Sequence, residues 1–268
     1  LEVLFHYLQL SPERGRIKKS DFNKNEKLSK SSINTLVKNE IFVETKEAVS
    51  RLIAEKSDVR DLEDLSPAQT VALAEVQEAF KEKNVAVLEG VTGSGKTHVY
   101  VKLIKEQVDK GNQVLYLLPE IALTAQIVVR LQKYFGNQVG IYHSKFNENE
   151  RVEIYQKVLK NEYKVILSAR SGVFLPFQNL GLIIVDEEHE RSYKQFDPSP
   201  RYHARDTAVM MSYLYKVNVL LGSATLSMET FNNVQQGKYA LVKLTERFGK
   251  AVMPELKFLD TIDLRNRK

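Results

Sequence analysis

The stretch Gly90-Val91-Thr92-Gly93-Ser94-Gly95-Lys96-Thr97 follows an apolar, β-prone run at residues 85–88 and opens a stretch of helical character at 97–108. It satisfies the pattern G-x-x-x-x-G-K-[ST], in which glycines allow successive backbone N–H groups to point at one anion. The N-terminal end of the following helix adds a positive partial charge. A position between a strand and a helix is where a phosphate-binding loop lies. The sequence therefore predicts a nucleotide site.

Each part of this loop has an expected role. Lys96 would place its ammonium group on the β- and γ-phosphates, and the Thr97 hydroxyl would ligate Mg²⁺. The remaining nucleotide contacts would come from the loop positions Gly90, Thr92, Gly93, Ser94 and Gly95. ATP and Mg²⁺ are therefore the expected cofactors.

A phosphate loop needs an acid on a nearby strand to hold the metal. Residues 182–185 read as a buried strand, and Asp186-Glu187-Glu188-His189 follows directly. We expect Asp186 to hold Mg²⁺ and Glu187 to position or deprotonate the attacking water, which makes Lys96, Asp186 and Glu187 the predicted catalytic set. The alternative is that the acids only cap the next helix.

Gln69 has two readings that do not exclude each other. Ser66-Pro67-Ala68-Gln69 has the form of a helix start, with a serine cap, a proline at the first helical position and glutamine at the third. A glutamine shortly before a phosphate-loop strand can also grip the edge of adenine, because its amide offers both a donor and an acceptor.

The pattern from residue 66 onward alternates strands and helices. Further apolar runs occupy residues 114–118, 139–142, 165–167 and 217–221, with helical stretches between most of them. Strands that are apolar throughout are buried on both faces, as in parallel sheets flanked by helices. We predict an α/β fold with a doubly wound parallel sheet over residues 66–245.

Residues 1–46 form a different segment. Helical patterns there precede a short β-prone run, Ile41-Phe42-Val43, and eight basic residues against two acidic ones lie between Arg14 and Lys38. This arrangement favours a small winged-helix (α+β) domain that binds DNA or a partner, with a helical adaptor as the alternative. Residues 47–65 read as a charged linker.

The amino-acid composition excludes several classes of protein. The 268 residues carry a net charge of +5 and no cysteine, which excludes disulfides and thiolate-held zinc within this chain. No apolar run approaches the ~20 residues that span a bilayer, and the N-terminus lacks a secretion signal. We expect a cytoplasmic protein that has no membrane partner.

Several motifs together resemble a known family. Asp186-Glu187-Glu188-His189 is a DExH-type box, Gly222-Ser223-Ala224-Thr225 contains the S-A-T motif, and residues 118–124 are similar to motif Ia of superfamily-2 helicases. The strings Ser192-Tyr193-Lys194-Gln195 and Pro200-Arg201-Tyr202-His203-Ala204-Arg205-Asp206 narrow the resemblance to the PriA family of bacterial replication-restart (primosomal) helicases. It covers about residues 66–250, and it implies a RecA-like motor lobe.

The resemblance implies an ATP-dependent DNA helicase that moves 3′→5′, acts on single-stranded and forked DNA, and promotes primosome assembly. Implied partners are primosome proteins and single-strand-binding protein, and the implied location is the bacterial nucleoid. His189, Ser223 and Thr225 would couple the ATP site to DNA. The loop at residues 193–205 interleaves aromatic rings, which stack on bases, with cations, which track phosphates. The predicted DNA contacts are Arg170, Tyr193, Lys194, Phe196, Arg201, Tyr202 and Arg205.

The chain also departs from this family. The family closes ATP between two lobes, and no second alternating set follows residue 250, so residues 246–268 would be the start of a truncated second lobe. The arginine finger and the zinc module expected in that lobe are missing from this sequence. We therefore expect a fragment that hydrolyses ATP poorly by itself. Two alternatives stay open, which are a non-enzymatic docking module for DNA or a partner and another superfamily-2 translocase.

Overall fold

The computed structural model describes residues 3, 5, 7, 30–42, 62–119, 125–143 and 146–247. The chain divides into two compact units, Leu1–Ser50 and Arg51–Lys268, and each is described by itself. Residues 120–124 of the expected motif Ia, residues 43–61 with most of the expected linker, and residues 248–268 lie outside the described ranges. No helix in the described ranges is long and apolar enough to cross a bilayer.

In the first unit the described helix is α3, Lys30–Lys38. Its Ile33 forms a small apolar cluster with Val3, and the rings of Tyr7 and Phe42, which pack against this cluster, lie 5.0 Å apart. The β-prone run expected after this helix does not begin as a strand. The N–H groups of Ile41 and Phe42 donate to the carbonyl of Leu36 at 3.0 and 3.1 Å, so these two residues close the end of the helix. The winged helix therefore stays a prediction.

The second unit contains a sheet of parallel strands in the order β3-β4-β2-β5-β6-β1-β7. This confirms the predicted doubly wound α/β fold. The strands are β1 (Val85–Gly90), β2 (Gln113–Leu117), β3 (Val139–Tyr142), β4 (Val165–Ser168), β5 (Leu180–Asp186), β6 (Asn218–Ser223) and β7 (Ala240–Leu244).

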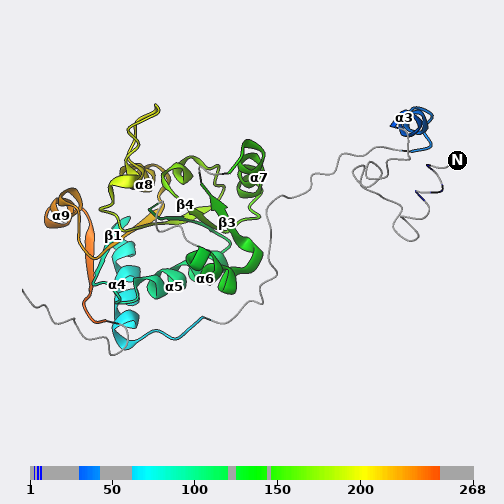
Figure 1. The fold of residues 1–268 in the computed structure, drawn as a ribbon. Coiled ribbons are helices and arrows are strands. Elements are labelled where there is room, and N and C mark those ends of the chain that lie inside the picture. The colour runs from blue at the N-terminus through cyan, green and yellow to red at the C-terminus, as the bar shows by residue number, and fades with distance from the viewer. Residues whose placement is uncertain are drawn as a thin grey trace, which may run out of the picture. The chain divides into compact units, whose positions relative to one another are not determined.

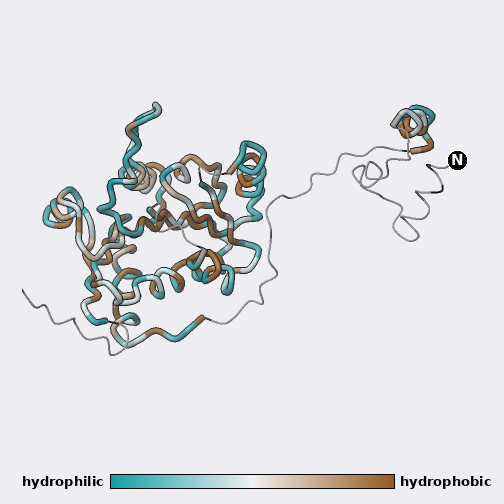
Figure 2. Tube along the Cα trace, in the orientation of Figure 1, coloured by the Kyte–Doolittle hydropathy of each residue, from teal (hydrophilic) through white to brown (hydrophobic). Residues whose placement is uncertain are grey.

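Helices cover both faces of this sheet, as Figure 1 shows. One core cluster joins the sheet to α4 (Pro67–Glu82), α5 (Lys96–Asp109) and α6 (Ala125–Phe135). The other joins its opposite face to α7 (Glu148–Leu159), α8 (Ala204–Tyr215) and the 3-10 turn η2 (Arg170–Phe174). Figure 2 shows the apolar colour concentrated along the strands between these layers. Burial on both faces explains why the central strands carry few polar residues.

Strand β7 was not predicted, and its position explains why. It lies at the edge of the sheet beside β1, and only its third and fifth residues are buried. An edge strand with one covered face alternates polar and apolar residues, and over five residues that signal is weak.

The strand order brings three predicted motifs to one edge. Strand β6 lies between β5 and β1, with Leu88 and Asp186 both in register with Gly222. Because the strands are parallel, their carboxyl ends lie at the same edge of the sheet, where open α/β sheets bind their ligands. The phosphate loop, the acids after β5 and the S-A-T motif are therefore neighbours.

Candidate functional site

The phosphate loop has the backbone that its glycines predict. Gly93 and Gly95 have φ angles of +80° and +81°, in the left-handed region that favours glycine. Helix α5 begins at Lys96 directly after Gly95. The Lys96 ammonium donates a hydrogen bond of 2.8 Å to the carbonyl of Gly90, so its charge lies across the loop. Thr97 follows in the first turn of α5 and is half-buried.

The donors of this loop fit a phosphate group. The Ser94 side chain is 1% exposed, and its Oγ has no hydrogen-bond partner among the described residues. A Cβ at Gly90 would lie 2.8 Å from that Oγ and 3.0 Å from Cγ of Lys96, so only glycine leaves both side chains in place. A buried polar atom beside left-handed glycines, a lysine and a helix N-terminus is the chemistry that binds phosphate.

Gln69 forms the predicted capping box of α4. Its Oε1 accepts from the N–H of Ser66 at 3.0 Å, and its own N–H donates to the Ser66 hydroxyl at 3.3 Å. The Nε2 atom then donates to the carbonyl of Ser94 at 3.0 Å, which ties α4 to the phosphate loop. The side chain is fully buried, so its amide presents no exposed edge to a base. The adenine contact proposed for Gln69 has no support in this arrangement.

Two tyrosines hold Asp186 at the end of β5. The hydroxyl groups of Tyr100 and Tyr116 donate to its two carboxylate oxygens at 3.0 and 3.2 Å. Burial, and next the charge of Glu187, raise the pKa of Asp186 above its ordinary value. Burial also raises the pKa of both tyrosines, so they stay protonated donors. Sequence reasoning missed these two residues, because they lie within an ordinary helix and an ordinary strand.

Gly222 makes room for one of these tyrosines. It lies in the middle strand of the three, opposite Asp186 in β5. A Cβ at this position would overlap the Tyr100 hydroxyl and lie 2.8 Å from Cζ of its ring. The first residue of the expected Gly-Ser-Ala-Thr motif is therefore glycine because the Tyr100–Asp186 hydrogen bond passes beside it.

Glu187 occupies a strained backbone position beside this carboxylate. Its φ is +48°, a left-handed conformation that is unfavourable for a residue with a Cβ atom. Its backbone N–H donates to Oδ1 of Asp186 at 3.1 Å. One carboxylate oxygen lies 3.7 Å from Nδ1 of His189, and the side chain is 38% exposed. Glu187 can therefore reach a solvent-exposed reactant beside the half-buried Asp186.

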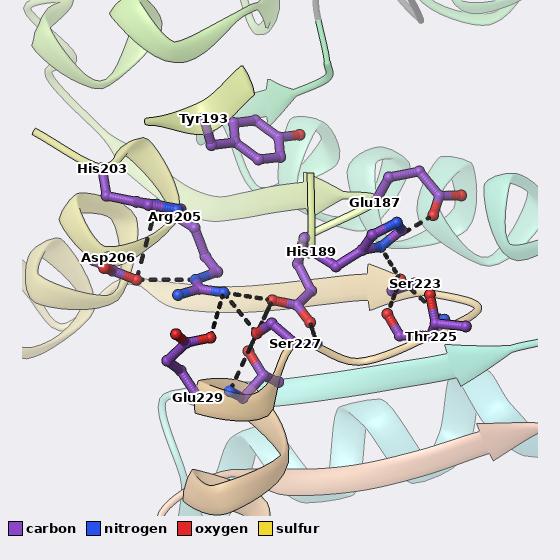
Figure 3. Close-up of polar contacts among 12 residues, drawn as sticks. Glu187, His189, Tyr193, His203, Arg205, Asp206, Ser223, Thr225, Ser227 and Glu229 are labelled. Carbon is purple, nitrogen blue, oxygen red and sulfur yellow. Dashed lines mark hydrogen bonds and ion pairs between the residues drawn. The ribbon is translucent and has the colours of Figure 1, made fainter. Parts of the chain in front are cut away.

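The three residues predicted to couple ATP to DNA lie in contact with one another. Nδ1 of His189 is 2.7 Å from the Ser223 hydroxyl oxygen, and that hydroxyl donates to the carbonyl of Thr225 at 2.7 Å. A hydroxyl has one proton, so His189 has to donate from Nδ1. Figure 3 shows His189 between Glu187 and Ser223, with Thr225 beyond. The side chains after β5 and β6 thus form one chain of contacts.

The 193–205 loop is pinned at its base and exposed at its tip. Lys194 and His203 form an antiparallel bridge, and the N–H of Gln195 donates to the carbonyl of Tyr202 at 2.9 Å. Beyond this base, Phe196 is 68% exposed and Arg201 is also exposed. The Tyr202 ring packs edge-on against Phe174, with centroids 4.8 Å apart. The predicted DNA contacts Phe196 and Arg201 are therefore accessible, and Lys194 and Tyr202 are half-buried.

Two of the predicted DNA contacts are internal instead. Tyr193 is 1% exposed, and its hydroxyl donates to the carbonyls of Asp186 and Leu117 at 2.6 and 3.1 Å. Arg205 is buried and pairs with Glu188. Neither side chain is exposed to a base or a phosphate in this structure, so the arrangement gives no support to the DNA contacts predicted for Tyr193 and Arg205. Arg170 is half-buried and donates to the carbonyl of Ser192 at 3.3 Å.

No group of three or more metal-binding side chains lies together in the described part of the chain. Mg²⁺ in nucleotide enzymes binds through one or two protein groups plus substrate phosphates and water rather than through a complete protein cage. Thr97 and Asp186 are the side chains whose oxygens would hold it here.

A phosphate loop, an acidic pair and a connecting Ser-Ala-Thr turn on adjacent parallel strands define a lobe of the P-loop nucleotide-binding class. The chain belongs to the DEAD/DEAH box helicase family, whose sequence model matches residues 66–234.

Individual proteins of known sequence or structure show how far this similarity extends. The chain is 37% identical to the replication restart protein PriA of Bacillus subtilis (strain 168) over 270 residues, covering 99% of this chain and 33% of that protein. It is 44% identical to the PriA protein of Haemophilus influenzae over 184 residues, covering 69% and 25% respectively. The chain thus spans a third or less of the length of these relatives. A structure of RecG bound to a three-way DNA junction shares the fold, with a TM-score of 0.52 at 20% identity, covering 70% of this chain and 24% of RecG.

Proposed function

We propose that this chain is the ATP-binding lobe of a DNA helicase that acts in replication restart. One observation carries the proposal. The phosphate loop, the Asp186-Glu187 pair and the His189–Ser223 contact lie at the carboxyl ends of three adjacent parallel strands. The similarity to replication restart proteins over 99% of the chain supports the restart role.

The residues at this edge of the sheet would have different roles in ATP hydrolysis. The loop N–H groups and Lys96 would bind the phosphates, while Thr97 and Asp186 would hold Mg²⁺. Bound Mg²⁺ would neutralise charge that develops on the phosphates. The tyrosine donors keep the Asp186 carboxylate in one orientation. Glu187 would position the attacking water and accept its proton.

Single-stranded and forked DNA are the proposed nucleic-acid partners. The exposed Phe196 ring and the exposed Arg201 cation offer the pairing of stacking and charge that binds single strands. The family resemblance supports 3′→5′ movement, primosome assembly, contacts with primosome proteins and single-strand-binding protein, and a location on the nucleoid in the bacterial cytoplasm. His189, Ser223 and Thr225 would pass nucleotide state to the DNA-binding surface.

Two experiments test the proposal. The first measures binding of a fluorescent ATP analogue with Mg²⁺ to the chain and to its Lys96→Ala variant. The second measures ATP hydrolysis with and without single-stranded DNA. We expect Mg²⁺-dependent nucleotide binding that the variant loses, and hydrolysis that DNA raises. DNA binding without nucleotide binding would instead favour a docking module and overturn the proposal.

A further inference from the structure

Glu188 is a buried carboxylate to which the roles above assign nothing. It is 0% exposed and accepts four hydrogen bonds. Arg205 donates at 2.9 Å, the N–H and hydroxyl of Ser227 donate at 2.7 and 2.9 Å, and the Thr230 hydroxyl donates at 2.8 Å. Its backbone N–H donates to the carbonyl of Gly222 at 3.1 Å. Glu188 therefore joins the turn after β5 to α8 and to α9.

These partners come from two distant parts of the chain. Arg205 lies in the first turn of α8, where the 193–205 loop ends. Ser227 is the N-cap of α9 (Met228–Gln235), and Thr230 lies in its first turn. Figure 3 shows Arg205 and Ser227 converging from these two elements. A helix N-terminus and a guanidinium both favour a negative charge, which explains how an ionised side chain is tolerated inside the protein.

Stability alone is a weak reason for such a pair. Replacing a buried ion pair by apolar residues of similar volume is often neutral or stabilising. We therefore looked to the neighbouring residue Glu187 for a second role of Glu188. Glu187 has a left-handed backbone with φ +48°, and Nδ1 of His189 approaches its carboxylate at 3.7 Å.

The backbone on both sides of Glu187 is held. On one side the tyrosines fix Asp186, and on the other the four donors fix Glu188. A residue in an unfavourable conformation persists only where its surroundings over-determine it. The direction of the Glu187 side chain is thus set through its neighbours.

We propose that Glu188 is a positioning residue, which, with Arg205 and the N-terminus of α9, holds Glu187 in the left-handed conformation that aims its carboxylate at the attacking water. This inference rests on the proposed function, because it assumes that Glu187 acts on that water. It concerns the geometry of hydrolysis and leaves nucleotide binding to the phosphate loop.

The structure offers a matched control on the same arginine. Glu229 lies 4.0 Å from Arg205, but its side chain is 72% exposed, against 0% for Glu188. An exposed pair at that distance contributes little. Glu229→Gln removes a charge beside Arg205 and leaves Glu188 and its donors intact, so hydrolysis should be unchanged.

The test compares a double variant, Glu188→Leu with Arg205→Met, with wild type and the control. This pair removes both charges together and fills the space with apolar side chains. Three quantities are measured, which are the urea midpoint of unfolding, the affinity for a fluorescent ATP analogue with Mg²⁺, and the single-turnover rate of ATP hydrolysis with the protein in excess. We expect affinity within about twofold of wild type and a hydrolysis rate reduced by about tenfold or more, because small misplacements of a reacting group produce losses of this size.

Conservative single variants complete the design. Glu188→Gln keeps an acceptor for the N–H of Ser227 and should keep more hydrolysis than the double variant. If the double variant fails to fold, Glu188→Gln and Arg205→Lys decide by the same comparison of hydrolysis with affinity. A wild-type rate in the double variant, or in both Glu188→Gln and Arg205→Lys where the double variant does not fold, overturns the positioning role alone, and so does a rate that falls only in proportion to affinity and midpoint. Wild-type protein that neither binds nor hydrolyses ATP overturns the proposed function instead.

Discussion

Gly222→Ala is the substitution that most directly tests the packing around the candidate metal-binding acid. The new methyl group would overlap the Tyr100 hydroxyl and lie 2.8 Å from Cζ of its ring. Because Tyr100 is fully buried between α5 and the sheet, the ring cannot move away freely. It would lose its 3.0 Å hydrogen bond to Asp186 or push the strand aside.

Two contributions set the expected decrease in the free energy of unfolding of Gly222→Ala. Inserting a methyl group into a packed core destabilises a protein by about 1–3 kcal/mol. Loss of a hydrogen bond to a charged acceptor adds about 1.5–3 kcal/mol when it breaks completely. Since the two strains relieve one another, we expect a decrease of about 3 kcal/mol in the free energy of unfolding for Gly222→Ala, below the sum of the upper limits.

A double-mutant cycle with Tyr100→Phe isolates the contact. Phenylalanine lacks the overlapping oxygen, so the double variant should be more stable than the sum of the single effects by about 1 kcal/mol. Rescue is partial, because the ring carbon still lies too close. Tyr163→Phe serves as the distant control, since that hydroxyl bonds Lys157 on α7, and it should add to Gly222→Ala within about 0.5 kcal/mol.

Urea unfolding followed by far-ultraviolet circular dichroism measures all of these variants. Additive effects of Gly222→Ala and Tyr100→Phe would refute the reasoning, because they would mean that the two side chains do not compete for the same space. A Gly222→Ala variant as stable as wild type would do the same.

Three further predictions concern the site. Lys96→Ala should abolish binding of an ATP analogue in a fluorescence titration and leave affinity for single-stranded DNA unchanged; equal nucleotide affinity would contradict the phosphate-loop assignment. Burial raises the pKa of Asp186 above its ordinary value of 3.8. Between that value and the raised value, the folded chain binds more protons than the unfolded chain. The free energy of unfolding therefore falls as pH rises through that window. Asp186→Asn should therefore be more stable than wild type at about pH 7 while losing Mg²⁺-dependent hydrolysis, and urea midpoints on both sides of the window check the sign. Phe196→Ala should weaken binding of single-stranded DNA by about 1–3 kcal/mol with little change in stability. Tyr193→Phe removes a buried donor, so it should lower stability by about 1–2 kcal/mol and leave DNA affinity unchanged. The reverse pattern would show that the loop opens on DNA.

The core of the fold was predictable because its signals are local. Six of the seven strands in the described sheet appear in the sequence as apolar runs at least three residues long, and the helix start at Ser66 has a complete capping pattern. Strand β7 was missed because one of its faces is polar and it has only five residues. A start for α9 could have been found from Ser227, which caps three residues ahead of Thr230.

The 193–205 loop shows where local reasoning fails. Tyr193, Phe196 and Arg205 have the same residue types as a DNA-binding surface, and the sequence treats them alike. In the fold, Phe196 lies at the exposed tip, while Tyr193 and Arg205 turn into the core and bond groups more than ten residues away, such as Leu117 and Ser227. Which face of a loop is buried depends on distant neighbours.

The octapeptide at residues 90–97 by itself indicated a phosphate-binding loop, because its glycines, lysine and threonine have a spacing that can be recognised in the sequence alone. The tertiary structure alone decided how the rest of the site is assembled. It placed β6 between β5 and β1, gave Asp186 its tyrosine donors, and enclosed Glu188 between α8 and α9. These contacts join residues far apart in the chain, and they depend on strand order and burial, which no local pattern of residues records.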